Sequence, residues 1–529
     1  MSDAPPEDLV PQSFALDEPV GHSVAIDETG VPGLDLVLGG GLPRGAMTLI
    51  IGPPGSGKTT LAIQTGFAVA KAGRRVLILT ALSEPTVKLV THMRTLSFFD
   101  PSLVGASVQI FNLGQFLKDG LEATADALVA AARQHRATLV VIDGFRGIRG
   151  AASVPQESRQ FLYDIGGRLN VLGATVIVTS EADARDSTLY PEATTADVII
   201  GISFALVGVR QRRGLEVLKV RGAAPFPGLH GMMLATSGVT VFPRLEARVV
   251  ASGTLEEDDP ATALSAAADE AVAHRAAFDL PQLDAMLGGG LTRGTRALLV
   301  GRVGTGKTLM GLQFAIAGVR LGEPTLFLGL RENIGQLVRK ADSFALGTEL
   351  RAALGSGALA VLRMPAIELD PDRLAVQLLD MIDKTGTKRL VVDSLAEVER
   401  AVNEQDHDRL HGFLAALLEA LRTRRVTGLF IKESRQGLPS AIDVSEDPFA
   451  AIAENVILIR QVELRSQQHR VISVLKMGFS NFDTTLREFV IAPPDGIRVL
   501  TPFEGDPVVL STVSGKDEIA TNTMAVPQD

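Results

Sequence analysis

Two glycine-rich stretches, 249 positions apart, combine residue types that can hold a polyphosphate. GPPGSGKTT runs from Gly52 to Thr60 and GRVGTGKTL from Gly301 to Leu309, and both satisfy G-x-x-x-x-G-K-[ST]. In such a phosphate-binding loop (P-loop), glycines let backbone N–H groups wrap the phosphates while the helix that follows favours their negative charge. Lys58 and Lys307 are placed to meet the β- and γ-phosphates. The sequence therefore predicts two nucleotide sites.

Acids at the ends of two apolar strands complete each predicted site. TLVVID ends at Asp143, and RLVVDS ends at Asp393 and Ser394, each acid about 85 positions after a P-loop lysine. Such a carboxylate holds Mg²⁺ through its water shell, while the P-loop threonine hydroxyl binds the ion directly. The predicted metal ligands are Thr59, Asp143, Thr308 and Asp393; the predicted nucleotide-binding residues are Gly52, Pro53, Pro54, Gly55, Ser56, Gly57, Lys58, Thr59 and Thr60, and Gly301, Arg302, Val303, Gly304, Thr305, Gly306, Lys307, Thr308 and Leu309.

Short apolar strands and helices alternate around both P-loops. Strands are expected before each loop and further along each half, and a helix from Lys58 to about Lys71 follows the first loop. This alternation predicts an α/β fold with a mainly parallel sheet flanked by helices, and a ligand at the carboxyl ends of the strands. The expected strands are Met47–Ile51, Arg75–Thr80, Thr138–Asp143 and Thr175–Glu181, then Arg296–Val300, Thr325–Leu330, Arg389–Ser394 and Gly428–Ser434.

The chain is an internal duplication. The pattern L-D-x-x-L-G-G-G-L-x-R-G leads into both P-loops at one fixed offset, with Gly39 pairing Gly288. Each half ends in a strand-rich segment, Asp197–Gly222 or Asn455–Gly478, which suggests a hairpin at the sheet edge. We expect a disordered tail at 1–20, a first domain at 21–245, an acidic linker at 246–275, a second domain at 276–502 and a disordered tail at 503–529.

Composition narrows the classes of function. The 529 residues are 46% hydrophobic and 21% charged, as globular domains are, and the net charge of −10 argues against a protein that coats nucleic acid. There is no cysteine for a disulfide or thiolate metal site, and the eight histidines lack metal-ligand spacing. Without a signal peptide or an apolar run near the roughly 18 residues of a membrane span, a cytoplasmic protein is expected.

These motifs together resemble the KaiC family, the double-domain RecA-type ATPases of the cyanobacterial clock. The resemblance covers about Ile26 to Val499 and rests on the leader, the P-loops, the strand-end aspartates, LEVLKVRG and SVLKMG. It implies two tandem RecA-like P-loop domains, ATP and Mg²⁺ as ligands, and a homohexameric double ring with ATP between neighbouring subunits.

The catalytic base is where the sequence departs from that family. There, two consecutive glutamates after the strand that follows the P-loop helix activate the attacking group. LTALSEP puts Leu82 and Ser83 at those positions, with Glu84 one step later, so Glu84 can serve only through a one-residue bulge. GLRENIGQL puts Arg331 and Glu332 there, and Glu332 keeps the family register. The alternative for both glutamates is a solvated acid at a helix N-terminus.

The first repeat keeps the family's pair of cations, whereas the second repeat keeps only one of them. The resemblance implies a Lys-x-Arg pair on the late hairpin that contacts the adjacent γ-phosphate and stabilises transition-state charge. The first half has Lys219 and Arg221, whereas the second has Lys476 and then Gly478. The alternative is that these are solvated strand residues. On the functional interpretation, the first site has the cations without a clear base, and the second has a base without its arginine.

The residues that a KaiC-type kinase would phosphorylate are missing. In that register stand Ala450 and Ala451, neither of which has a hydroxyl, and Ser445 is the nearest alternative. The leading hypothesis is therefore a slow Mg²⁺-dependent ATPase that acts as a nucleotide-driven signalling or timing switch in a ring, with an unknown signalling protein as partner. The alternatives are a serine/threonine autokinase, a DNA-associated RecA-type ATPase, and a scaffold that binds ATP without hydrolysing it.

Two smaller features carry open alternatives. The basic run Arg210–Arg213 can form a solvated hairpin turn or meet nucleic-acid phosphates, and the scarcity of aromatic residues that stack bases argues against DNA. Glu181 and Glu433, at strand ends, can sense a γ-phosphate or serve in a cap or ion pair.

Overall fold

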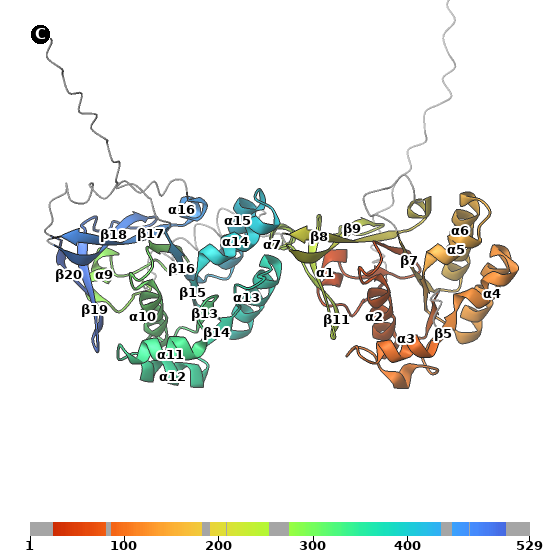
Figure 1. The fold of residues 1–529 in the computed structure, drawn as a ribbon, viewed down its shortest axis with the longest axis horizontal. Coiled ribbons are helices and arrows are strands. Elements are labelled where there is room, and N and C mark those ends of the chain that lie inside the picture. The colour runs from red at the N-terminus through yellow and green to blue at the C-terminus, as the bar shows by residue number, and fades with distance from the viewer. Residues whose placement is uncertain are drawn as a thin grey trace, which may run out of the picture. The chain divides into compact units, whose positions relative to one another are not determined.

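The computed structural model describes residues 25–80, 86–181, 191–207, 209–252, 275–434, 447–464 and 466–503. Outside these ranges lie the predicted tail 1–20, nearly all of the tail 503–529, most of the predicted linker, and the positions Leu82, Ser83, Glu84 and Ser445. The chain divides into two compact units; the second consists of 242–529 together with 205–214 and 228–231. Each unit carries one copy of the repeat (Figure 1).

A nine-stranded sheet with the order β11-β10-β9-β8-β3-β7-β6-β4-β5 carries the first P-loop. The strands from β8 to β5 in this order run parallel to their neighbours. Met47, Leu49 and Ile51 of β3 face the apolar cluster that contains α4 and α6, and α2 packs on the other face of the sheet. Alternate residues thus serve opposite faces, as the pleat requires, and both faces are apolar because both are covered.

The second sheet repeats this arrangement with the order β14-β13-β15-β16-β12-β17-β18-β19-β20. The strands from β14 to β17 pair in parallel, and β17 to β20 pair antiparallel. Leu298 and Val300 of β12 pack with α13, α14, α15 and α16, while Ala297 and Leu299 pack with α9, α10, α11 and α12. The prediction of two α/β domains with mainly parallel, helix-flanked sheets is confirmed.

The bounds of the elements follow the predicted segments closely. The strands of the first repeat are β1 Ile26–Asp27, β2 Leu42–Pro43, β3 Met47–Ile51, β4 Val76–Thr80, β5 Val108–Asn112, β6 Leu139–Asp143, β7 Thr175–Ser180, β8 Val198–Val207, β9 Arg210–Val220, β10 His230–Ala235 and β11 Gly238–Phe242. Its helices are α1 Leu34–Leu38, α2 Lys58–Lys71, α3 Thr86–Met93, α4 Leu121–His135, α5 Phe145–Ala151 and α6 Pro155–Val171.

The second repeat has the same order of elements around its P-loop. Its strands are β12 Arg296–Gly301, β13 Thr325–Gly329, β14 Leu359–Arg363, β15 Arg389–Asp393, β16 Thr427–Glu433, β17 Asn455–Leu464, β18 Gln467–Met477, β19 Arg487–Ala492 and β20 Gly496–Pro502. Its helices are α7 Leu245–Ala251, α9 Pro281–Met286, α10 Lys307–Arg320, α11 Ile334–Asp342, α12 Gly347–Ser356, α13 Pro371–Thr385, α14 Leu395–Gln405, α15 Arg409–Thr423 and α16 Pro448–Ile452. No described helix is both long and apolar enough to cross a bilayer.

The prediction that the late hairpins form the sheet edges is wrong. β8 pairs in parallel with β3 and β17 with β12, so both hairpins lie inside their sheets. On the side of the hairpins the edge strands are β11 and β20, which belong to further strand pairs after each hairpin; the opposite edges are β5 and β14. β11 and β20 each begin with glycine, a residue that also marks turns.

The start of the predicted linker is helical. Helix α7 spans Leu245–Ala251, and Leu245 and Val249 are buried in the core of the second unit beside α13 and α15. These two apolar side chains lie four residues apart, so they share one face of the helix. The ends of the domains within 253–274 lie outside the described residues and remain predictions.

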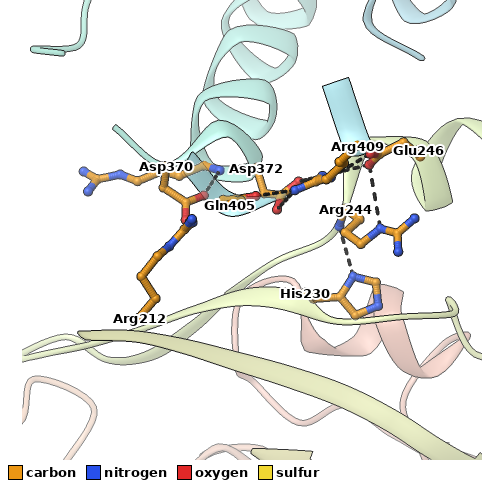
Figure 2. Close-up of polar contacts among 9 residues, drawn as sticks. Arg212, His230, Arg244, Glu246, Asp370, Asp372, Gln405 and Arg409 are labelled. Atoms are coloured by element: carbon orange, nitrogen blue, oxygen red, sulfur yellow. Dashed lines mark hydrogen bonds and ion pairs between the residues drawn. The ribbon is translucent and has the colours of Figure 1, made fainter. Parts of the chain in front are cut away.

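A mostly buried arginine, with 13% of its side chain exposed, ties α7 to two helices of the second unit. Arg409, at the start of α15, donates to both oxygens of Glu246 at 2.7 and 2.8 Å and also to Asp372 and Gln405 (Figure 2). Burial raises the pKa of Asp372. Burial would also raise the pKa of Glu246, but the hydrogen bond and charge of Arg409 hold it below its usual value. One guanidinium thus compensates two buried carboxylates.

The basic run beside this cluster is part of a strand. Arg210 and Arg212 lie at the start of β9, and Arg212 forms an ion pair with Asp370, the N-cap of α13 (Figure 2). Arg210 lies 3.4 Å from Glu404. The prediction of a solvated hairpin turn at these residues is therefore wrong. The carboxylates that offset both charges come from distant parts of the sequence, which no local pattern reveals.

Removing the buried arginine tests this arrangement. We expect Arg409→Met to lower the unfolding free energy of α15 by about 3–5 kcal/mol at pH 7, because Glu246 and Asp372 would lose their buried partner. The loss should be smaller at pH 5. Without Arg409, burial would raise the folded-state pKa values of Glu246 and Asp372 above their unfolded values. Ionising these carboxyl groups then costs stability as the pH rises through those pKa values, and this cost is smaller at pH 5 than at pH 7. Hydrogen exchange of α13 and α15 measures both effects.

The matched control for this prediction is Arg351→Met. Arg351 forms an ion pair with Asp342 on the surface, with more than a third of both side chains exposed. Such pairs contribute about 0–1 kcal/mol. Equal effects of the two changes would contradict the role given to Arg409.

Candidate nucleotide-binding and hydrolysis sites

Each P-loop joins the end of a buried strand to the start of a buried helix. Lys58 begins α2, is 8% exposed, and donates from Nζ to the carbonyls of Gly52 at 2.8 Å and Pro53 at 2.9 Å. Lys307 makes the equivalent bonds to Gly301 at 2.8 Å and Arg302 at 2.7 Å. Burial lowers the pKa of both lysines, and nearby carboxylates oppose that shift. Both ammonium groups therefore lie inside their loops, where phosphate oxygens can replace the carbonyls.

The loop glycines meet a steric requirement that fits a phosphate cradle. A Cβ on Gly52 would lie 2.4 Å from the carbonyl oxygen of Ile202, and one on Gly301 would lie 2.6 Å from that of Ile459. Each loop therefore starts directly against the backbone of β8 or β17. Gly55 has a φ of +74°, and a Cβ added to it would meet no described atom within 4 Å, so its conformation alone favours glycine there.

The predicted metal ligands meet in pairs. Thr59 Oγ1 donates to Asp143 at 2.9 Å, and Thr308 Oγ1 donates to Asp393 at 2.7 Å. Thr179 Oγ1 also donates to Asp143, at 2.6 Å. Burial raises the pKa of Asp143 and of Asp393, against the hydrogen bonds that they accept. A hydroxyl and a carboxylate are oxygen ligands of the kind that Mg²⁺ prefers, so the residues present fit that ion.

Glu332 lies in the second site near Thr308 and Asp393, the two predicted metal ligands. It falls between β13 and α11, two residues after Leu330, whose backbone N–H donates to the carbonyl of Asp393 at 2.8 Å. Burial raises the pKa of Asp393, and the charge of Glu332 raises it further. Its Oε1 accepts a hydrogen bond from Lys340, whereas its Oε2 is buried and has no hydrogen-bond partner among the residues that the structure describes. An unpaired buried carboxylate oxygen carries a desolvation cost unless a ligand or water donates to it. This oxygen can accept a proton from a water placed in the site.

The sequence pointed to Arg331 and Glu433 separately but did not predict that they pair; both Glu433 and Glu181 form ion pairs, one of the alternatives given for them. Arg331 Nη1 lies 2.6 Å from Glu433 Oε1, and its Nε donates to Glu397 at 2.9 Å. The hydrogen bond to Glu433 raises the pKa of Arg331. In the first site Glu181, the counterpart of Glu433, forms an ion pair with Arg146 at 3.1 Å. These pairings depend on which strands are neighbours, so no local sequence signal predicts them.

The predicted trans cations lie far from the P-loop of their own repeat. Lys219 Nζ donates to the carbonyl of Ala196, and Arg221 lies 3.1 Å from Asp197, whose carboxylate accepts the backbone N–H of Met47. Met47 begins β3, whereas the P-loop follows the end of β3. Lys476 similarly pairs with Val456 near the start of β17. The sheet therefore separates these cations from their own P-loops by about the length of a strand, roughly 16 Å.

The other predicted positions divide between the described and undescribed parts of the chain. Ala450 and Ala451 lie in α16, just before β17, and their side chains are methyl groups. That they stand in the register of the phosphorylated pair of KaiC remains a prediction. Lys476 Nζ donates to both of their carbonyls, at 3.4 and 3.2 Å. Glu84, the candidate base of the first site, lies outside the described residues.

The fold and the paired sites define a protein with two RecA-like P-loop nucleotide-binding domains. The profile of the family described as "ATPase: KaiC" matches residues 27–246 and 279–504. The chain belongs to the KaiC ATPase family. The resemblance inferred from the motifs is thereby confirmed.

Curated relatives match nearly the whole chain. The circadian clock protein KaiC3 of Synechocystis sp. is 27% identical over 493 residues, which cover 90% of this chain and 92% of the relative. The circadian clock oscillator protein KaiC of Synechococcus elongatus is 26% identical over 517 residues, 94% of this chain and 95% of the relative. That of Thermosynechococcus vestitus is 26% identical over 474 residues, 88% and 87% of the two chains.

Replacing the hydroxyl of Thr59 tests whether this residue binds Mg²⁺. We expect Thr59→Val in a Lys307→Ala background to weaken nucleotide binding at the first site by about 10-fold or more in Mg²⁺, because the ion loses a direct ligand. In EDTA the variant and its parent should bind alike. Titration with a fluorescent nucleotide measures both affinities.

Thr65→Val is the control on the same helix. Thr65 is buried in α2 and donates to the carbonyl of Leu61, within the helix itself. It should leave the Mg²⁺ dependence unchanged. A loss of affinity for Thr59→Val that persists in EDTA would contradict the metal role.

Proposed function

We propose that this KaiC-family protein binds Mg·ATP at both P-loops, hydrolyses it slowly at the second, and uses nucleotide state as a signalling or timing switch in a ring. The observation that carries the proposal is Glu332, which has one carboxylate oxygen buried and unpaired near the Thr308–Asp393 pair. There it can accept a proton from the attacking water as the oxygen of that water bonds to the γ-phosphorus and ADP departs.

The composition of each site supports a slow reaction. The second repeat lacks the arginine that stands at Arg221 in the first, because Gly478 occupies that position. Loss of an arginine that stabilises transition-state charge costs about 10³-fold or more. The first repeat has Lys219 and Arg221 but Leu82 at the first position of the base. Slow turnover suits a switch, which must keep one nucleotide state long enough for a partner to respond.

The position of Lys219 and Arg221 supports a ring. They lie at the edge of the sheet where β3 begins, so they cannot serve the P-loop at the opposite edge of their own sheet. Their proposed role at a phosphate therefore requires a second subunit. A homohexamer, in which every subunit both receives and supplies these cations, satisfies this requirement.

The structure gives less support to the other functions considered. A kinase that modifies the residues of α16 before β17 would find the methyl groups of Ala450 and Ala451 at the positions that the family resemblance indicates. Binding of nucleic acid through Arg210 and Arg212 would have to displace carboxylates that already neutralise them.

Removing the P-loop lysines separates the two sites. We expect wild-type turnover to be slow but measurable, to persist in Lys58→Ala, and to fall by at least about 10²-fold in Lys307→Ala, because only the second site has a described base. The double variant sets the background of a phosphate-release assay. If wild type and double variant are equally silent while nucleotide still binds, the hydrolysis proposal fails and a non-hydrolysing scaffold replaces it.

The mass in solution tests the ring. We expect light scattering in saturating Mg·ATP to give about six times the 55.9 kDa of one chain. Lys219→Ala combined with Arg221→Ala should weaken the assembly, because a subunit would lose its contacts with the neighbouring phosphate. A mass of one chain under these conditions contradicts the ring.

A further inference from the structure

The second nucleotide site contains an arginine that the first repeat does not have at the corresponding position. Arg331 stands two residues after the end of β13, and Leu82 stands at the matching place after β4. The second repeat has also lost the cation at Gly478 that the first keeps as Arg221. Each repeat thus has one arginine that the other lacks: Arg221 in the first repeat and Arg331 in the second.

Arg331 lies at the mouth of its own P-loop. Glu433, to which Arg331 Nη1 is bound at 2.6 Å, pairs in the strand register with Gly301, the first residue of the loop. Burial lowers the pKa of Lys307, and the positive charge of Arg331 lowers it further. Because β12, β13 and β16 belong to one parallel sheet and end at the same edge, Arg331 reaches this P-loop without help from another subunit.

The partners of Arg331 can release it at little cost. Glu397 is also bound by Arg400 at 2.7 Å, so it keeps a cation when Arg331 leaves. Glu433 remains in the field of Lys307. Arg331 is 43% exposed, which leaves room for its guanidinium to turn. A γ-phosphate offers more negative charge than a single carboxylate and matches the forked guanidinium with two oxygens.

We propose that Arg331 binds the γ-phosphate of the nucleotide held on the P-loop of its own subunit, taking in cis the role that Arg221 has in trans in the first repeat. This inference rests on the proposed function. During hydrolysis the water oxygen bonds to the γ-phosphorus, the bond to the ADP oxygen breaks with its electron pair leaving on ADP, and a water proton passes to Glu332. Arg331 balances the charge on the γ-phosphoryl oxygens. With ADP bound it returns to Glu433 and Glu397.

The test uses the full chain with Lys58→Ala, so that only the second site binds nucleotide tightly. The affinities for ATPγS and ADP are measured by displacement of a fluorescent nucleotide, and turnover is measured in parallel. We expect Arg331→Ala to reduce the preference for ATPγS over ADP by about 10- to 100-fold, the value of a charged hydrogen bond. The affinity for ADP should stay within about threefold, which also shows that the variant is folded. Arg331→Lys should recover only part of the preference, because lysine lacks the fork.

Arg400→Ala is the matched control. It removes a cation from the same carboxylate, Glu397, but from the surface of α14. Because Glu397 would then hold Arg331 more firmly, it should lower the nucleotide preference only slightly, by much less than Arg331→Ala does. The inference is overturned if Arg331→Ala keeps the preference of its parent within about threefold, or if Arg400→Ala lowers it equally.

Turnover distinguishes this inference from the proposed function. If the parent does not hydrolyse ATP but Arg331→Ala still loses the preference for ATPγS, the hydrolysis proposal fails and the contact with the γ-phosphate stands. If turnover by the parent is real and Arg331→Ala changes neither turnover nor preference, the proposed function stands and this inference fails.

Discussion

The register of the parallel strands is the constraint on which both sites depend. Asp143 is paired across the ladder with Thr80 of β4 and Thr179 of β7, and Asp393 with Gly329 and Ile431. The carboxyl ends of these strands therefore lie at the same end of the sheet, and the helix after the P-loop begins there too. The hydroxyl of Thr59 meets Asp143 because two rigid elements end together, not because a flexible loop folds toward it. A slip of one residue in β6 would turn the carboxylate to the other face of the sheet.

This constraint also explains which features the sequence could predict. The P-loops and the strand-end acids are local signals, since each lies next to the run of apolar residues that places it. The strand Met47–Ile51 was predicted with its observed bounds because a strand covered on both faces is apolar throughout. The role of each site residue remains a prediction.

What could not be predicted depends on contacts between distant segments. Arg331 and Glu433 lie 102 positions apart and meet only because the strands that precede them belong to the same sheet. The sequence shows Arg331 as a departure from a family pattern and gives no reason to join it to Glu433. The strands at the sheet edges escaped notice for a different reason. β11 and β20 each begin with glycine, and β20 ends in proline, residues that also mark turns in a sequence.

A single hairpin in each repeat contacts the P-loop at one end of the sheet and carries a predicted trans lysine at the other. Gly52 packs against the carbonyl of Ile202 in β8, and Gly301 packs against that of Ile459 in β17. The same hairpins carry Lys219 and Lys476 at the opposite edge of their sheets. The close contact at the glycine leaves no space for the loop to move toward the strand without moving the strand itself. In the ring proposed above, one hydrogen-bonded element would therefore connect a change at the phosphate-binding loop to the cation that a subunit offers to its neighbour.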